Sequence, residues 1–150
     1  MYIAVRNVTE TDIDALFEIR TSVTQNHLSR AQMTELGITS ELLTNLINQH
    51  PCAWIAEVDG TAAAFSMVDI EAGEVFALFT RPEYEGFGLG RLLMSAAEKY
   101  LFTRHEKIWL ITDGREGIRA NGFYQHLGWS QVAAVDEIDV RYEKRRPSAV

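Results

Sequence analysis

The chain has 150 residues, of which 47% are apolar and 23% charged, and its formal net charge is −7. A chain of this size can bury one sizeable core, so we expect residues 1–150 to form a single domain. The acidic balance argues against nucleic-acid binding, which needs clustered Lys and Arg, and no stretch approaches the ~20 apolar residues of a membrane helix.

The first 51 residues carry the pattern of one strand and two helices. Apolar and polar side chains alternate over residues 2–8, which predicts a strand. N-capping residues at 9–12 then precede a helix. Its apolar face contains Ile13, Leu16, Phe17, Arg20 and Val23. After a loop, Thr39 or Ser40 can cap a second helix, which ends at Pro51.

Three consecutive strands are predicted next, over residues 53–58, 62–69 and 74–80. Two short turns join them: Asp59-Gly60 has the composition of a two-residue hairpin loop, and Ala72-Gly73 marks a second hairpin. Strands connected in this way pair antiparallel. The middle of the chain is therefore predicted to form an antiparallel meander.

The end of the third of these strands meets a helix through three glycines at alternate positions, Gly86, Gly88 and Gly90. The helix is indicated by an apolar stripe at three-and-four spacing. The stripe consists of Leu89, Leu92, Leu93, Ala96, Ala97, Tyr100 and Leu101. Glycine lets a ligand approach the backbone closely, and the first N–H groups of a helix lack partners and carry the positive end of its dipole. This junction is therefore predicted to bind phosphate.

Two familiar phosphate-binding patterns fit this junction poorly. A dinucleotide-binding fold has G-x-G-x-x-G in its first strand–helix turn, whereas these glycines follow some 85 residues of chain. A P-loop ends in Gly-Lys-Ser/Thr, but Gly90 is followed by Arg91. A plain glycine turn without a ligand also remains open.

The last third of the chain predicts a strand over residues 108–112, a short helix with Phe123 and Tyr124, and two strands over 131–135 and 138–142. The complete order is β-α-α-β-β-β-α-β-α-β-β. This order predicts an α/β (α+β) fold with helices flanking a mixed sheet.

Two segments resemble a known family. Residues 82–93, P-E-Y-E-G-F-G-L-G-R-L-L, are similar to the acetyl-coenzyme A loop of the GNAT superfamily of N-acyltransferases, Gln/Arg-x-x-Gly-x-Gly/Ala. Residues 119–129, R-A-N-G-F-Y-Q-H-L-G-W, resemble its signature R-A-x-x-F-Y-x-x-x-G-F/W. Two positions depart from the pattern: Glu85 stands where the Gln or Arg belongs, and Gly117 where an Asn is often found.

The resemblance implies a mostly antiparallel central sheet in which the strand before the loop and the strand after the long helix splay apart. The acyl-bearing arm of acetyl-CoA would lie in this gap. The implied cofactor-binding residues are Leu78, Phe79 and Thr80 on the strand, Glu85, Gly86, Phe87, Gly88, Leu89, Gly90 and Arg91 at the loop, and Phe123. We expect backbone amides to hold the pyrophosphate and the Glu85 carboxylate to face solvent or pair with Arg81.

For catalysis, the resemblance implies that Tyr124 is the general acid that protonates the leaving thiolate. A lysine-like amine with a pKa of ~10.4 must also lose a proton, at a cost of roughly 4.6 kcal/mol at pH 7. The candidate base is Glu74, with Asp69 and Glu71 as alternatives and a water relay to the backbone as a further one.

The predicted function is an acetyl-CoA-dependent N-acetyltransferase that acts on a primary amine of a small molecule, amino acid or peptide. A homodimer is open, because dimers are common among members of the superfamily. His27 and Glu35 fall in the segment that covers the acceptor site in this superfamily. A non-catalytic acyl-CoA sensor is the alternative, and a nucleotide-binding module is a third reading, which the Phe123-Tyr124 segment disfavours. Thiol release from acetyl-CoA separates turnover from binding.

The remaining signals argue against other chemistry. Cys52 is the only cysteine, so it has no partner for a disulfide and is predicted to be a small buried hydrophobe. The four histidines lack a metal-ligand spacing such as H-E-x-x-H, so we expect no metal. The N-terminus lacks the pattern of a secretion signal, so we expect a cytoplasmic protein.

Overall fold

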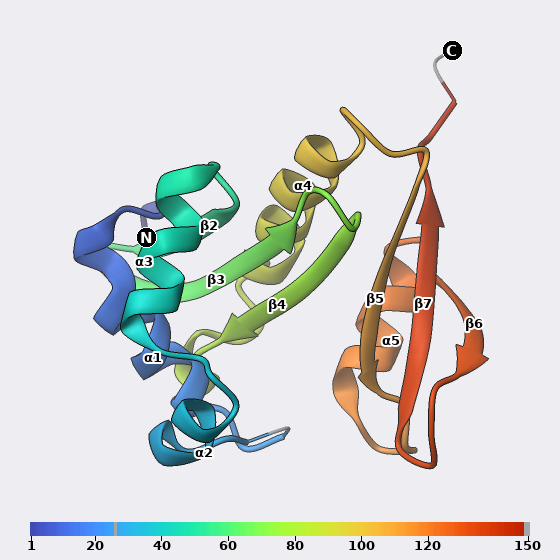
Figure 1. The fold of residues 1–150 in the computed structure, drawn as a ribbon, viewed down its shortest axis with the longest axis horizontal. Coiled ribbons are helices and arrows are strands. Elements are labelled where there is room, and N and C mark those ends of the chain that lie inside the picture. Colours follow the sequence, from blue (N-terminus) through green and yellow to red (C-terminus); the bar gives the residue numbers. More distant parts are fainter. Residues whose placement is uncertain (26, 149–150) are drawn as a thin grey trace.

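The computed structural model describes residues 1–25 and 27–148. These residues form a seven-stranded sheet with helices on both faces (Figure 1). Its elements are β1 (Ile3–Asn7), α1 (Ile13–Ser22), α2 (Arg30–Glu35), α3 (Ser40–Gln49), β2 (Ala53–Val58), β3 (Thr61–Asp69), β4 (Glu74–Thr80), α4 (Leu89–Leu101), β5 (Lys107–Asp113), α5 (Arg119–His126), β6 (Ser130–Ala134) and β7 (Asp139–Arg145), with 3₁₀ turns at Glu10–Asp12 and Pro82–Tyr84. The strand order is β1-β2-β3-β4-β5-β7-β6, and only β4 and β5 pair in parallel. The predicted mixed, mostly antiparallel sheet is confirmed.

A buried carboxylate fixes the start of α1. Asp12 is 8% exposed and accepts two hydrogen bonds from the Arg6 guanidinium, at 2.7 and 2.8 Å, and one from the Thr9 amide at 2.8 Å. The Arg6 contact lowers the pKa of Asp12 to about 2. Because this cluster joins β1 to the first turn of α1, it fixes the orientation of α1 on the sheet.

The helix α2 is absent from the element order that apolar periodicity and turn residues predicted. Ser29 is its N-cap: the Ser29 hydroxyl accepts from the Gln32 amide at 3.1 Å, and the Gln32 side chain accepts from the Ser29 amide at 2.8 Å. This reciprocal pair is a capping box, which satisfies two N–H groups at the helix start. The helix is only six residues long, too short for its apolar spacing to be recognised.

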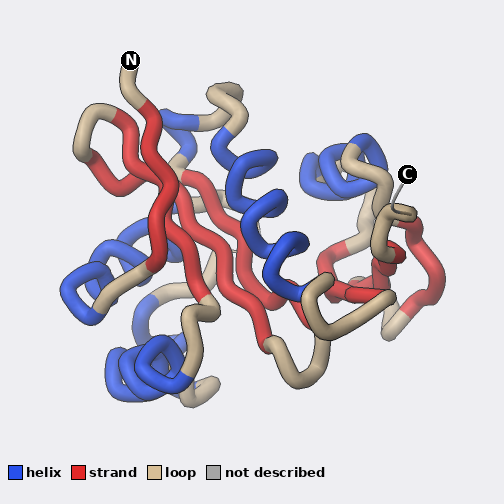
Figure 2. Tube along the Cα trace, turned by 90° about the horizontal axis from the view of Figure 1, so that it is seen from above, coloured by secondary structure: helices blue, strands red, loops and turns tan. Residues whose placement is uncertain are grey.

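The helices form two layers on the sheet of β1 to β4. The helices α1 and α3 cover one face and α4 covers the other (Figure 2). Contact with α4 is close enough for the buried Ser66 hydroxyl on β3 to donate to the Leu93 carbonyl of α4 at 3.3 Å. The predicted buried position of Cys52 is confirmed.

The sheet opens between β4 and β5. These strands pair at Glu74 and Trp109 alone and then diverge (Figure 1). The closed end is held by Trp109, whose amide donates to the Gly73 carbonyl at 3.0 Å and whose indole N–H donates to the Ala72 carbonyl at 2.9 Å. The divergence leaves a wedge that widens toward Thr80, next to the glycine junction.

Candidate functional site

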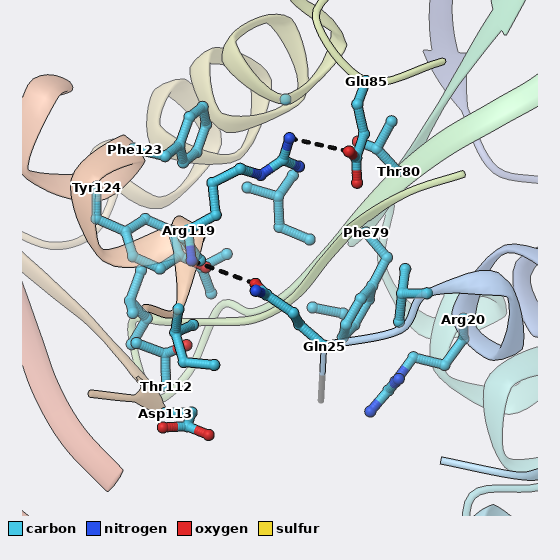
Figure 3. A pocket seen from close by; sticks show the side chains of 18 of the residues that line it. Arg20, Gln25, Phe79, Thr80, Glu85, Thr112, Asp113, Arg119, Phe123 and Tyr124 are labelled. Atoms are coloured by element: carbon cyan, nitrogen blue, oxygen red, sulfur yellow. Dashed lines mark hydrogen bonds and ion pairs between the residues drawn. The ribbon is translucent and has the colours of Figure 1, made fainter. Parts of the chain in front are cut away.

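A cleft of about 1150 Å³ fills the wedge between β4 and β5. Its walls come from β4, the glycine junction, the end of β5, the start of α5 and the connection from α1 to α2 (Figure 3). The predicted site residues that line it are Leu78, Phe79, Thr80, Glu85, Gly86, Gly88, Leu89, Gly90, Arg91, Phe123 and Tyr124. Segments that are far apart in the sequence thus meet in one cavity, with an exposed strand edge on one side.

The β4 edge is the first binding element of the cleft. On its other side β4 pairs with β3 from Glu74 to Thr80. Toward β5, the only paired position is Glu74. Backbone N–H and C=O groups beyond that point face the cavity without a strand partner, and such an edge binds an extended ligand by the hydrogen bonds of strand pairing.

The glycine junction is the second binding element. Gly88 is the N-cap of α4 with φ +79°, a left-handed conformation that a side chain disfavours, and no side chain caps this helix. The Leu92 amide, 3.3 Å from the Gly88 carbonyl, makes the first bond of the helix. The amides of Leu89, Gly90 and Arg91 precede it, so they are free for an anion at the positive end of the helix dipole.

Gly90 has a separate role, which concerns packing. A Cβ at this position would lie 3.2 Å from Cζ of Phe123, closer than an ordinary van der Waals contact, so a larger residue would require the Phe123 ring to shift by a few tenths of an ångström. The contact brings α5, and Tyr124 next to Phe123, to the cleft.

Glu85 does not pair as expected. Its carboxylate lies 2.9 Å from the Arg119 guanidinium of α5 (Figure 3). Arg81, the expected partner, binds Glu18 of α1 at 3.2 Å and donates to the Ala62 carbonyl at 2.9 Å. The expected pairing with Arg81 was wrong because α5 brings Arg119 across the cleft, a long-range approach that local spacing does not reveal, while the Glu85 side chain stays 37% accessible to solvent.

A second bridge crosses the cleft at Gln25, in the connection after α1. The Gln25 side chain donates to the Gly117 carbonyl at 3.2 Å and accepts from the Arg119 amide at 3.2 Å (Figure 3). Gly117 has φ +88°, which suits the turn before α5. Gly117, which stands where the family pattern often has Asn, is therefore hydrogen-bonded through its backbone to the connection after α1.

Tyr124 is buried in the wall of the cleft. It is 8% exposed, and its ring packs against Phe123, Trp129 and Tyr142 with centroid separations of 5.6, 6.5 and 5.5 Å. Burial raises the pKa of Tyr124 to about 12, while the Thr112 side chain acts in the opposite direction. The phenol therefore keeps its proton over the whole physiological range and can donate a hydrogen bond.

Asn121 holds α5 in place behind Tyr124. Its amide group donates to the Asp113 carbonyl at 2.9 Å, and its oxygen accepts from the Tyr142 hydroxyl at 2.9 Å. These bonds connect α5 to the end of β5 and the middle of β7, so they hold the helix that contains Tyr124 in position.

Comparison with known proteins agrees with this geometry. The family model of the acetyltransferase (GNAT) family matches residues 13–129. The chain belongs to this family. The structure of the PaiA N-acetyltransferase from Thermoplasma acidophilum in complex with coenzyme A superimposes with a TM-score of 0.82 and 22% identity, covering 97% of this chain and 100% of that one.

Two curated relatives match part of the chain. An uncharacterized N-acetyltransferase of Archaeoglobus fulgidus is 35% identical over 79 residues, which are 47% of this chain and 54% of the relative. A mycothiol acetyltransferase of Beutenbergia cavernae is 33% identical over 86 residues, which are 53% of this chain and 29% of the relative. The matched parts thus span about half and under a third of these relatives.

Two predicted site residues of this GNAT chain lie apart from the cleft lining. Glu74 sits at the closed end of the wedge, where β4 still pairs with β5, and burial raises the pKa of its carboxyl group. Phe87 is 42% exposed, and its ring lies 6.2 Å from that of Tyr84. The structure therefore does not bring Glu74 together with Tyr124.

The wall of the cleft formed by α1 and the connection after it contains residues that the sequence analysis did not list as site residues. Arg20 and Gln25 line the cleft, as does His27, whose Nε2 lies 3.1 Å from the Thr21 carbonyl, whereas Glu35 does not. The sequence held one signal for Arg20: it is the only charged member of the apolar face of the first predicted helix.

Among the described residues, no group of three or more His, Cys, Asp or Glu is arranged to hold a metal. Across the same part of the chain, every helix is too short or too polar to cross a membrane.

Proposed function

We propose that this chain is an acetyl-CoA-dependent N-acetyltransferase that acts on a primary amine of a small molecule, amino acid or peptide. The observation that carries the proposal is that an open strand edge, the free amides of α4 and the buried phenol of Tyr124 line one cleft. Membership of the GNAT family and the names of the two curated relatives support it.

The cleft fits the parts of coenzyme A. The amides of Leu89, Gly90 and Arg91 suit the pyrophosphate, and the free β4 edge at Leu78 to Thr80 suits the amide groups of the pantetheine arm. Acetyl-CoA supplies an activated thioester carbonyl. A β4 amide that donates to the carbonyl oxygen would stabilise the negative charge that develops there.

Acyl transfer forms a C–N bond and breaks the C–S bond. In the proposed step, the neutral amine attacks the carbonyl carbon, its nitrogen loses a proton, and the Tyr124 hydroxyl donates a hydrogen bond to the departing sulfur. A thiol with a pKa near ~8.5 is a stronger acid than a phenol with a pKa of about 12, so complete proton transfer from Tyr124 to sulfur is uphill by ~5 kcal/mol. Tyr124 therefore stabilises the negative charge that develops on sulfur, and the released thiolate takes its proton from solvent.

The amine must also lose a proton. Two carboxylates of the cleft are held in ion pairs, Glu85 with Arg119 and Asp113 with Arg115 at 2.7 Å, and the Arg115 contact lowers the pKa of Asp113. A third carboxylate, Asp139, lines the cleft opposite Asp113 in the pairing of β7 with β5. Glu74 lies outside the cleft lining. We assign deprotonation to water that passes the proton to solvent, in place of the expected Glu74.

The test is a coupled measurement of binding and turnover. Calorimetry should show that the protein binds coenzyme A, and a thiol-reactive dye should report release of coenzyme A when a panel of primary amines is added with acetyl-CoA. Binding without thiol release for any amine would support the non-catalytic sensor instead. Failure to bind coenzyme A would refute both functions.

A further inference from the structure

A second cavity, of about 260 Å³, adjoins the cleft beneath α1, α2 and α3. Its lining is apolar, with Phe17, Met33, Leu43, Leu46 and Met67 among the residues, and Arg20 is the only charged one. Its size is below the ~300–1,000 Å³ of sites for drug-sized ligands, so it suits one apolar group of a small molecule.

Arg20 lies in the wall that the two cavities share. It lines both of them, together with Leu28, Phe76, Ala77 and Phe79. Its guanidinium carbon lies 4.2 Å from the centroid of the Phe79 ring (Figure 3). A group bound to Arg20 would therefore have the apolar cavity on one side and the β4 edge on the other.

Within the described part of the chain, the Arg20 guanidinium has no counter-ion. Its Nη1 atom is buried and, within residues 1–25 and 27–148, has no hydrogen-bond partner. Burial lowers the pKa of this side chain. Three nearby carboxylates are engaged elsewhere: Glu18 binds Arg81, Glu85 binds Arg119, and Asp113 binds Arg115. Asp139 also lines the cleft, at the start of β7. A half-buried cation with an unpaired, buried N–H group is costly, and a planar guanidinium matches a carboxylate with two parallel hydrogen bonds.

We propose that the acceptor is an amino acid with a free carboxylate and an apolar side chain, with the carboxylate on Arg20 and the side chain in the apolar cavity. This inference rests on the proposed acetyltransferase function and specifies its substrate. In such a molecule the carboxylate, the side chain and the amine are attached to one carbon atom. The three regions that would receive them, Arg20, the apolar cavity and the β4 edge, lie next to one another. The amine then points toward the β4 edge, where acyl transfer is proposed.

The competing class of acceptor is a polyamine or a lysine side chain. Such a molecule would bring a second cation to Arg20 and leave the buried guanidinium without an anion. The cavity also offers little to a polar chain, because all its lining residues apart from Arg20 are apolar. These observations favour the amino acid.

The first experiment compares acceptors that differ in one group. We expect kcat/KM for leucine and phenylalanine to exceed that for 3-methylbutan-1-amine and 2-phenylethylamine by about tenfold to a hundredfold, the effect of hydrogen bonds to a charged group. Along the series alanine, 2-aminobutyrate and norvaline, kcat/KM should rise about fourfold per methylene group. Higher activity with the decarboxylated amines or with spermidine would overturn the inference.

The second experiment assigns the preference to Arg20. Arg20→Gln should remove the advantage of leucine over 3-methylbutan-1-amine and leave affinity for coenzyme A unchanged, whereas Arg20→Lys should retain part of the advantage. Arg30→Gln is the matched control, because Arg30 also stacks on an aromatic ring, 3.7 Å from the Phe17 centroid, but lines neither cavity. If Arg30→Gln abolished the preference and Arg20→Gln kept it, the assignment would be wrong.

The two proposals fail in different ways. If coenzyme A does not bind, or no amine is acetylated, the proposed function fails. If coenzyme A binds and amines are acetylated without regard to the carboxylate, only the substrate inference fails. The acceptor panel on the parent protein decides this even if Arg20→Gln does not fold.

Discussion

The two sides of the cleft are built in different ways. The cofactor side uses backbone: the open edge of β4, the left-handed Gly88 and the first amides of α4. The acceptor side uses side chains from α1 and the connection after it, chiefly Arg20, Gln25 and His27. A backbone site serves one constant ligand, whereas a side-chain site can differ between relatives that share the fold. The comparison explains why the cofactor follows from the family, while the acceptor must be inferred from this chain's own residues.

The largest expected effect is at Tyr124, where the two sides meet. Tyr124→Phe removes only the proton donor, so we expect kcat to fall by ~10²–10⁴-fold with cofactor affinity unchanged. Stopped-flow or steady-state thiol release at saturating substrates measures kcat, and calorimetry measures the affinity for coenzyme A. Tyr100→Phe is the control, since Tyr100 is a partly buried tyrosine that packs against Trp54 and lies outside the cleft lining. A parent-like rate in Tyr124→Phe would reduce Tyr124 to a packing role.

The pH dependence follows from the raised pKa of Tyr124. Because that pKa is about 12, the phenol stays protonated as the pH rises through 10, while the acceptor amine becomes deprotonated. The rate should therefore increase with pH and level off without a decline below pH ~11, since a general acid limits the rate only near its own pKa. A pH–rate profile of kcat/KM tests this. A descending limb near pH ~10, the usual pKa of a phenol, would contradict the effect of burial.

The next effect isolates the backbone side. Gly88→Ala should weaken coenzyme A binding more than about tenfold, because a Cβ obstructs the phosphates and the left-handed φ of +79° becomes strained. Gly60→Ala is the matched control: Gly60 has φ +83°, also in open space, but lies in the β2–β3 hairpin away from the cleft. Both variants should lose about 1–2 kcal/mol of stability, the cost of a side chain in this conformation.

Calorimetry and thermal unfolding of the two glycine variants separate the effects. Equal losses of stability with a loss of affinity in Gly88→Ala alone would support the backbone site. Full affinity for coenzyme A in a folded Gly88→Ala protein would remove the glycine junction from the cofactor site.

The contrast between backbone and side chains also explains what the sequence could predict. Strand alternation and the hairpin turns placed β2, β3 and β4 to within a residue, and three alternate glycines marked the start of α4. These are local features. The strand β7 extends to Arg145, three residues beyond the prediction, because pairing with β5 and β6 continues past its apolar residues.

The contacts that the sequence missed are long-range. Glu85 meets Arg119, and Gln25 meets Gly117, only after α5 and the first helical layer pack on opposite sides of the cleft. The helix α2 is an exception, because its capping box, Ser29 with Gln32, was visible in the sequence. The position of Glu74 also depends on tertiary structure: its place on β4 follows from local pattern, but which end of β4 opens to the cleft depends on the pairing with β5.

The smallest expected effect concerns the ion pair that spans the two walls. Glu85 and Arg119 are both partly exposed, with side chains 37% and 67% accessible, and together they add no net charge at the phosphate-binding turn. Glu85→Gln leaves Arg119 as an unopposed cation and should tighten coenzyme A binding. Arg119→Gln leaves the carboxylate unopposed and should weaken it. Each change should be at most about fivefold, because exposed ion pairs contribute ~0.2–1 kcal/mol.

The two substitutions are expected to change the affinity for coenzyme A in opposite directions, so the predicted effects can be distinguished from experimental error. Both effects should shrink between about 0.1 M and about 1 M salt, as the Debye length falls from ~10 to ~3 Å. The double variant should bind like the parent protein, and Glu83→Gln, an exposed carboxylate two residues away, should change affinity less than Glu85→Gln does. If Glu85→Gln weakened binding at both salt concentrations, the carboxylate would be holding the turn in shape through Arg119. The pair would then belong to the architecture of the cofactor side, and the division between a backbone wall and a side-chain wall would not hold at this point.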